Sequence, residues 1–135
     1  MLRSVRIERA TETPLDEQDY EVEISDHGDF VRIVVRGVHD LGRAQRFIQR
    51  VRDTAKAKGQ RRILIDGRAF TNPMPNDHRF AIGEMVAKEW PGLRVAVISP
   101  VEAQNGFIET VAVNRGADTR GFMGEDEAAE WLLRT

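Results

Sequence analysis

Two short apolar runs decide how this chain folds: Arg62-Ile63-Leu64-Ile65-Asp66-Gly67 and Leu93-Arg94-Val95-Ala96-Val97-Ile98-Ser99. Each run is too short and too uniformly apolar to be a surface helix, and each is followed by a stretch whose apolar residues recur every three or four positions. This alternation is typical of strands that are buried on both faces of a parallel sheet and joined by crossover helices. The sequence therefore predicts an α/β protein.

Residues 20–37 come before the first of these runs and carry the pattern of a β-hairpin. Residues 20–24 alternate between polar and apolar side chains, as expected of a strand with one face in water. Four turn-forming residues, 26–29, separate them from a second β pattern at 30–37. We therefore predict an antiparallel hairpin here, and we expect residues 1–18 to form an N-terminal arm or a further strand.

Helical spacing of apolar residues predicts two helices between these strands. The first lies between Asp40, which is expected to be its N-cap, and Gly59, which is expected to end it. The second carries an apolar stripe over residues 82–90, and Asn76 or Asp77 is its expected cap.

Two more helices are expected after the run at 93–99. Ser99-Pro100-Val101-Glu102 has the form of a capping box with proline at the first helical position, although Gly106 favours a later start. A short strand at 119–123 and a helix at 125–133, with acidic residues in its first turn, complete the chain. The expected order is ββαβαβαβα: an N-terminal hairpin followed by right-handed βα units around a mostly parallel sheet.

The composition bounds the classes of function. With 135 residues the chain is expected to form one domain, 1–135, and without cysteine it has no disulfide, thiolate metal site or cysteine nucleophile. No apolar run is long enough for a membrane span, and the N-terminus lacks the apolar block of a secretory signal. These features predict a cytoplasmic protein.

Charge is unevenly distributed along the chain. Residues 8–29 hold nine acidic side chains and one arginine, whereas residues 43–62 hold eight basic side chains and one aspartate. A basic stripe of this kind could bind nucleic acid. We expect instead that the basic residues form the solvent-exposed face of one helix, because the formal net charge is −2 and no aromatic residues alternate with the basic ones for base stacking.

Several segments together resemble the SpoIIAA-like, or STAS, domains, and in particular the STAS/SEC14-type branch of small stand-alone bacterial proteins. The likeness rests on the hairpin, helix and strand that end at Ile63-Leu64-Ile65-Asp66, and on Val95-Ala96-Val97-Ile98. It also rests on the tail, with Asn114-Arg115-Gly116, Arg120-Gly121-Phe122-Met123 and the acidic helix that ends in Trp131-Leu132. The match covers most of the chain from Tyr20 onward.

The resemblance implies a STAS-like fold and a role in regulation or ligand sensing rather than in catalysis. Anti-sigma-factor antagonists of this family carry a phosphorylated serine at the start of the helix after the third strand. The corresponding residues here are Asn76, Asp77 and His78, so the serine is missing. We therefore do not carry the kinase-controlled switch over to this chain.

In an open parallel sheet, ligands bind beyond the carboxyl ends of the strands. The residues that the sequence brings to this edge as ligand or partner contacts are Asp66, Arg68, Phe70, Thr71, Asn72 and His78. Asp66 can also be interpreted as the partner of Arg68 in a structural ion pair. Asp40 and Ser99 lie near the same edge and are interpreted as helix caps.

Two function classes follow from these residues. The first hypothesis is a non-enzymatic STAS-like module that binds a small or lipid-like molecule or a protein partner, without a cofactor or metal, and that could form a homodimer because the sheet has edges to cover. The alternative is a small hydrolase or metal-dependent enzyme that uses His39, Asp66 and His78 as two histidines and one carboxylate. Nucleic-acid binding is not expected.

Overall fold

The computed structural model describes residues 6–11, 20–37, 40–70, 75–99 and 106–134. The strands within these ranges are β1 (Arg6–Thr11), β2 (Tyr20–Asp26), β3 (Val31–Gly37), β4 (Arg62–Phe70), β5 (Arg94–Ile98) and β6 (Asp118–Phe122). The helices are α1 (Leu41–Lys58), α2 (Asn76–Glu89), α3 (Phe107–Asn114) and α4 (Glu125–Leu133). The segment left open as an arm or a strand thus contains a strand, β1.

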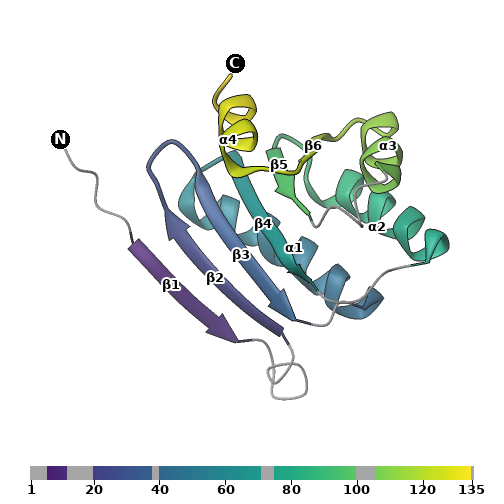
Figure 1. Ribbon diagram of the computed structural model, residues 1–135, viewed down its shortest axis with the longest axis horizontal. Helices are drawn as coiled ribbons and strands as arrows, with labels where there is room; N and C mark the ends of the chain where they lie inside the picture. Colours follow the sequence, from purple (N-terminus) through teal and green to yellow (C-terminus); the bar gives the residue numbers. More distant parts are fainter. Residues whose placement is uncertain (1–5, 12–19, 38–39, 71–74, 100–105, 135) are drawn as a thin grey trace.

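One sheet holds all of these strands in the order in which they occur along the chain, from β1 to β6. The pairs β1–β2 and β2–β3 are antiparallel, and the pairs from β3 to β6 are parallel. Ile63 lies beside Val95 and Ile65 beside Val97, so the two runs that decided the fold are parallel neighbours. The predicted hairpin and mostly parallel sheet are confirmed (Figure 1).

Helices cover the two faces of the sheet unequally. Alternate residues of β2 to β5, such as Ile33 and Ile65, pack against α1, α2 and α3 in the larger hydrophobic core. The opposite residues, such as Leu64 and Ala96, pack in a smaller core against Ala128 and Leu132 of α4. Helix α4 lies over β4 and β5, and the corresponding face of β1 to β3 is uncovered in Figure 1.

Local signals at both ends of α1 act as the sequence predicted. The Asp40 carboxylate accepts a hydrogen bond from the Arg43 backbone N–H at 2.8 Å, and Gly59 ends the helix in the left-handed conformation at φ 61°.

Gly28 turns the β2–β3 hairpin with φ 85°, and its N–H donates to the Asp26 carboxylate. The indole N–H of Trp90 donates to the carbonyl of Ile48 and ties the end of α2 to α1.

Other local predictions need correction. The cap of α2 is Pro75, which makes no side-chain hydrogen bond, so the prediction of Asn76 or Asp77 as the cap was wrong. Helix α3 begins at Phe107 directly after Gly106, which agrees with a late start. The proposed capping box at Ser99 extends into residues 100–105, outside the described residues.

Strand β4 is longer than the sequence indicated. Pairing with β5 stops at Asp66, opposite Ile98, but β4 continues beside β3 as far as Phe70, with a bulge between Val34 and Arg36. Asp66 therefore lies in mid-strand rather than at the strand end. The parallel pairing with β3 extends β4 beyond the end of β5, which the run of apolar residues could not show.

None of the helices in the described ranges is both long and apolar enough to cross a bilayer.

Candidate functional site

The predicted site residues that the structure describes lie in two separate parts of the molecule. Asp66 and Arg68 lie on β4, Phe70 is its last residue, and His78 lies in the first turn of α2. Thr71 and Asn72 lie outside the described residues. The predicted group is therefore best considered as an ion cluster on β4 and a separate surface on α2.

Asp66 is the centre of the ion cluster. It is 8% exposed, and its carboxylate accepts hydrogen bonds from the side chain of Arg68, at 3.0 Å from Nε and 2.7 Å from Nη2, and from the Arg68 backbone N–H at 3.2 Å. Arg32 of β3 donates a further bond at 2.9 Å. The predicted ion pair between Asp66 and Arg68 is confirmed, and it belongs to a larger network.

Glu125, the first residue of α4, completes this network. Its Oε1 lies 2.7 Å from Nη2 of Arg32 and 3.4 Å from Nη2 of Arg68. Each arginine therefore bridges the two carboxylates. Arg32 and Glu125 could not be found from the sequence because they are 34 and 59 residues away from Asp66 along the chain. The pairing of β3 with β4 brings Arg32 close to Asp66, and the packing of α4 against the sheet brings Glu125 close to it.

The electrostatics of the cluster keep Asp66 charged. Hydrogen bonds from the Arg68 side chain hold the pKa of the Asp66 carboxyl below its usual value, and this outweighs the opposite effect of burial. The same pair raises the pKa of Arg68 above its usual value. A carboxylate that already accepts several hydrogen bonds from arginines is a weak proton acceptor, so this arrangement does not favour general-base catalysis by Asp66.

His78 is on the other side of the sheet from Asp66. Helix α2, which carries the half-buried His78, packs in the larger core with α1 and α3, whereas Asp66 points to the face that α4 covers. His39 lies outside the described residues. The structure thus does not bring Asp66 and His78 into one site, and within the ranges that it describes no three His, Asp or Glu side chains are grouped to hold a metal ion.

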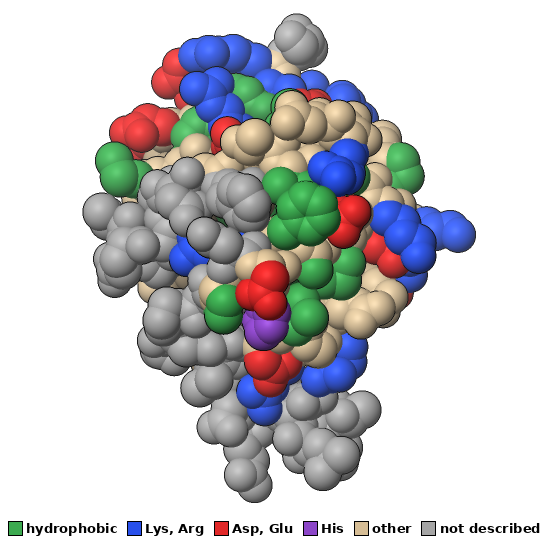
Figure 2. Space-filling view, turned by 90° about the vertical axis from the view of Figure 1, so that its right-hand side faces the viewer, with side chains coloured by type: hydrophobic (Ala, Val, Ile, Leu, Met, Phe, Trp, Pro, Cys, Tyr) green, Lys and Arg blue, Asp and Glu red, His purple; other side chains and the backbone are tan. Residues whose placement is uncertain are grey.

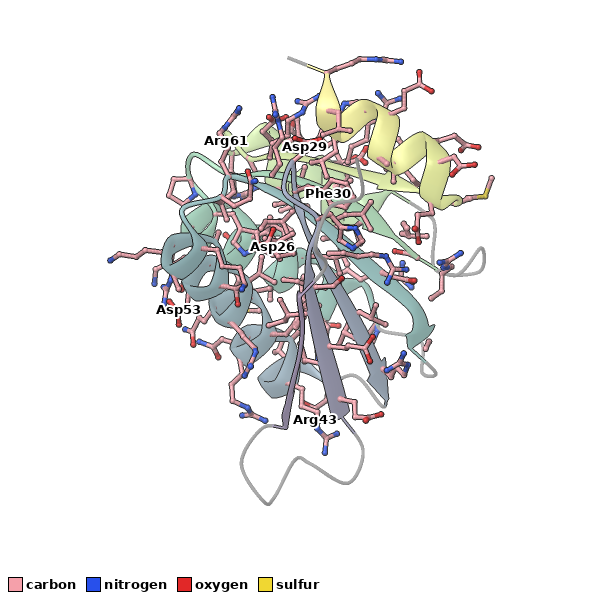
Figure 3. The ribbon with its side chains drawn as sticks, turned by 90° about the vertical axis from the view of Figure 1, so that its left-hand side faces the viewer. Asp26, Asp29, Phe30, Arg43, Asp53 and Arg61 are labelled. Carbon is pink, nitrogen blue, oxygen red and sulfur yellow. The ribbon has the colours of Figure 1, made fainter. Side chains whose placement is uncertain are left out.

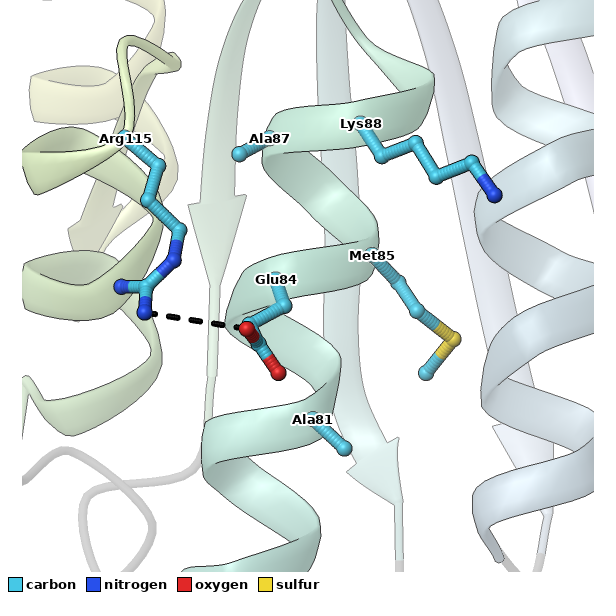
Figure 4. A pocket seen from close by; sticks show the side chains of 6 residues that line it. All are labelled: Ala81, Glu84, Met85, Ala87, Lys88 and Arg115. Atoms are coloured by element: carbon cyan, nitrogen blue, oxygen red, sulfur yellow. Dashed lines mark ion pairs between the residues drawn. The ribbon is translucent and has the colours of Figure 1, made fainter.

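The surface of α2 and α3 carries an open groove next to exposed apolar side chains. Ala81 and Met85 of α2 lie in the groove, and Glu84 pairs across it with Arg115 at 3.7 Å (Figure 4). The groove has a volume of about 570 Å³. Phe80 is 39% exposed under the Arg115 guanidinium, and Val113 is 47% exposed. On this side of the molecule, hydrophobic side chains lie among charged ones (Figure 2).

The basic stripe of residues 43–62 is spread along the molecule. Arg43 and Arg61 lie towards opposite ends in Figure 3, with Asp53 between them. Arg43 pairs with Asp40 at 3.1 Å, and Arg52 pairs with both Asp53 and Glu89. Acidic neighbours within the fold therefore neutralise part of the stripe.

Comparison with known proteins supports the fold. No protein-family model matches the chain, and no curated protein is similar in sequence. An anti-sigma factor antagonist from Mycobacterium paratuberculosis, known from its crystal structure, is similar with a TM-score of 0.56. The similarity covers 91% of this chain and 98% of that chain at 15% sequence identity. With the hairpin, the parallel βα units and the strand order described above, this likeness shows that the chain has a STAS-like fold.

Proposed function

We propose that this single-domain chain is a non-enzymatic, STAS-like regulatory module that binds a protein partner through the surface of α2 and α3. The likeness in fold to an anti-sigma factor antagonist supports a regulatory role. We also propose that the protein acts in the cytoplasm.

The observation that carries this proposal is the exposed apolar surface beside the groove. Phe80 and Val113 expose large apolar side chains, and Met85 lines the groove together with charged residues such as Lys88. Apolar groups surrounded by charged side chains are typical of protein interfaces, where the apolar centre supplies affinity and the charged rim supplies orientation. An open groove suits a protein surface better than a small molecule, which usually needs a more enclosed pocket.

The ion cluster supports a non-enzymatic role. The Asp66 carboxylate is held by Arg32 and Arg68, and His78 is on the other face of the sheet. The hydrolase alternative needs both groups at one substrate. No observation among the described residues favours that reaction over binding.

The experiment compares partner capture by three forms of the protein. Wild type, Phe80→Ser and Met123→Ser are used as baits in a lysate of the source organism, and captured proteins are quantified by mass spectrometry. Met123 is the matched control, because it is more exposed than Phe80, at 61% against 39%, and lies beside β6 rather than on α2. The captured partner is then purified and its binding to each form is measured by calorimetry.

We expect Phe80→Ser to weaken binding by about ten-fold or more, since loss of a central aromatic contact costs about 2 kcal/mol and ten-fold corresponds to about 1.4 kcal/mol, while Met123→Ser binds as wild type does. Equal binding by all three forms would exclude this surface. Native mass spectrometry of the freshly purified protein tests the other predicted ligands. A stoichiometric small or lipid-like molecule that wild type binds and Phe80→Ser loses, or a homodimer that dissociates in Phe80→Ser, would assign this surface to that occupant and contradict the proposal.

A further inference from the structure

Two arginine side chains converge on one carboxylate at the surface of the ion cluster. Arg32 and Arg68 come from neighbouring strands, and Nη2 of each lies within 3.4 Å of the same oxygen of Glu125. Asp66 lies beneath them and fixes both guanidinium groups through bonds of 2.9 Å and 2.7 Å. The arginines are therefore held in place by Asp66 whether or not Glu125 is present.

The charges of the cluster leave room for one anion. Asp66 neutralises one of the two arginines, so a single positive charge remains for a group on the outer side. A carboxylate carries one negative charge and two acceptor oxygens, which match the planar donor edges of arginine. The buried Nε of Arg32 has no hydrogen-bond partner among the described residues, so the donors of this arginine are not all used.

Glu125 is more loosely held than Asp66. Its side chain is 44% exposed, against 11% for Asp66. It accepts one short bond of 2.7 Å from Arg32, whereas its 3.4 Å contact with Arg68 is long for a hydrogen bond. Helix α4 does not depend on Glu125 for its position, because Ala128 and Leu132 are fully buried in the smaller core. The Glu125 side chain can thus leave the arginines while α4 stays in place.

We propose that Arg32 and Arg68 form a receptor for a carboxylate group, and that Glu125 occupies this receptor as an internal, exchangeable ligand. The external ligand is a carboxylate, supplied either by a small organic acid or by an acidic side chain of a protein. Its binding displaces the Glu125 side chain, while α4 stays in place through Ala128 and Leu132. This receptor lies on the other face of the sheet from the groove on α2 and α3, and it stands without the proposed function.

The test removes the internal ligand and supplies carboxylate from solution. Glu125→Ala is titrated with sodium propionate, which resembles the end of a glutamate side chain, against sodium chloride at equal ionic strength. Binding is followed by NMR through the backbone N–H of Arg68 and the Nε–Hε signals of the arginines. Asp126→Ala is the matched control, because Asp126 is an exposed acid in the same turn of α4.

We expect saturable binding of propionate to Glu125→Ala, on the order of ten-fold tighter than to wild type, because in wild type the tethered carboxylate competes at high local concentration. Asp126→Ala should bind like wild type. The double variant Glu125→Ala/Arg68→Ala should lose the response. Tetraglutamate peptide distinguishes the sources: tighter binding than propionate assigns a protein side chain, and weaker binding assigns a small acid.

Two results would overturn the proposal. One is a response of Glu125→Ala no larger than that of Asp126→Ala, and the other is a response that survives Arg68→Ala. Circular dichroism of each variant confirms that the comparison is made between folded proteins. A failure here leaves the partner surface around Phe80 untouched, because that experiment uses neither arginine.

Discussion

Asp66 makes the ion pair with Arg68 that the sequence predicted, and it also belongs to a larger network that the sequence did not show. The sequence placed it at the end of an apolar strand with Arg68 two residues on, and that pair is present at 2.7 Å. The structure adds Arg32 and Glu125, which convert a local pair into a link between β3, β4 and α4. Because the Asp66 side chain is only 11% exposed, its ion pairs contribute more than a pair between two side chains at an open surface.

Asp66→Asn should lower the free energy of unfolding by about 2 kcal/mol at neutral pH, since it removes the charged acceptor from two arginines. The pKa of the folded Asp66 carboxyl lies below the ordinary 3.8, so its contribution is present above that value and is lost as the pH falls through the lowered pKa. Urea unfolding should therefore show the gap between wild type and variant closing below about pH 4.

Asp53→Asn serves as the control for this measurement, because Asp53 is exposed and pairs with Arg52 at the surface. Its effect should stay below about 1 kcal/mol. A gap for Asp66→Asn that is equally small, or that does not change with pH, would mean that the carboxylate contributes no stability through these bonds.

At the scale of elements, the contact between α2 and α3 depends on one glycine. A Cβ atom at Gly83 would lie 2.7 Å from the Cβ of Val111 and 3.0 Å from the carbonyl oxygen of Ile108. Such distances are too short for a real contact, so the two helices approach closely only because residue 83 has no side chain.

Gly83→Ala should destabilise the protein by about 1–2 kcal/mol, because overpacking outweighs the higher helix propensity of alanine. Gly42→Ala in α1 is the control. Its Cβ would meet no atom closer than 3.5 Å, so the substitution should be neutral or stabilising by less than about 1 kcal/mol. Thermal unfolding of both variants measures the difference, and a neutral Gly83→Ala would mean that the helices can separate without cost.

At the scale of the whole molecule, two cores of different size hold the layers together. Among the described residues, three helices bury one face of the sheet, and α4 covers part of the other face through a small cluster. Within that cluster Leu132 is fully buried, while its neighbour Leu133 is 41% exposed. The attachment of α4 thus depends on few side chains.

Leu132→Ala should lower the free energy of unfolding by about 3 kcal/mol, since it removes a buried side chain and leaves a cavity between α4 and the sheet. Leu133→Ala should change it by less than about 0.5 kcal/mol. Urea unfolding followed by circular dichroism gives both values. A similar decrease in the free energy of unfolding for both variants would show that α4 does not pack against the sheet through Leu132 as described.

From Tyr20 onward, the sequence by itself determined the elements and their order, because the spacing of apolar residues reports which side of each segment is buried; whether residues 1–18 contain a strand was left open. It also predicted the Asp66–Arg68 pair and the cap at Asp40, where both partners are close along the chain. The geometry of such local interactions depends on few backbone dihedral angles, so the residues that form them can be predicted from the sequence before the fold is known.

Only the tertiary structure decided which distant residues meet. Strand register brought Arg32 to Asp66, and the packing of α4 on the same face brought Glu125. The packing of α2 on the opposite face separated His78 from both. Register and face depend on the packing of all layers at once, and a shift of one residue reverses which side chains face each other. The apolar pattern of one segment shows which of its sides is buried, but not which residues of a distant segment lie beside it.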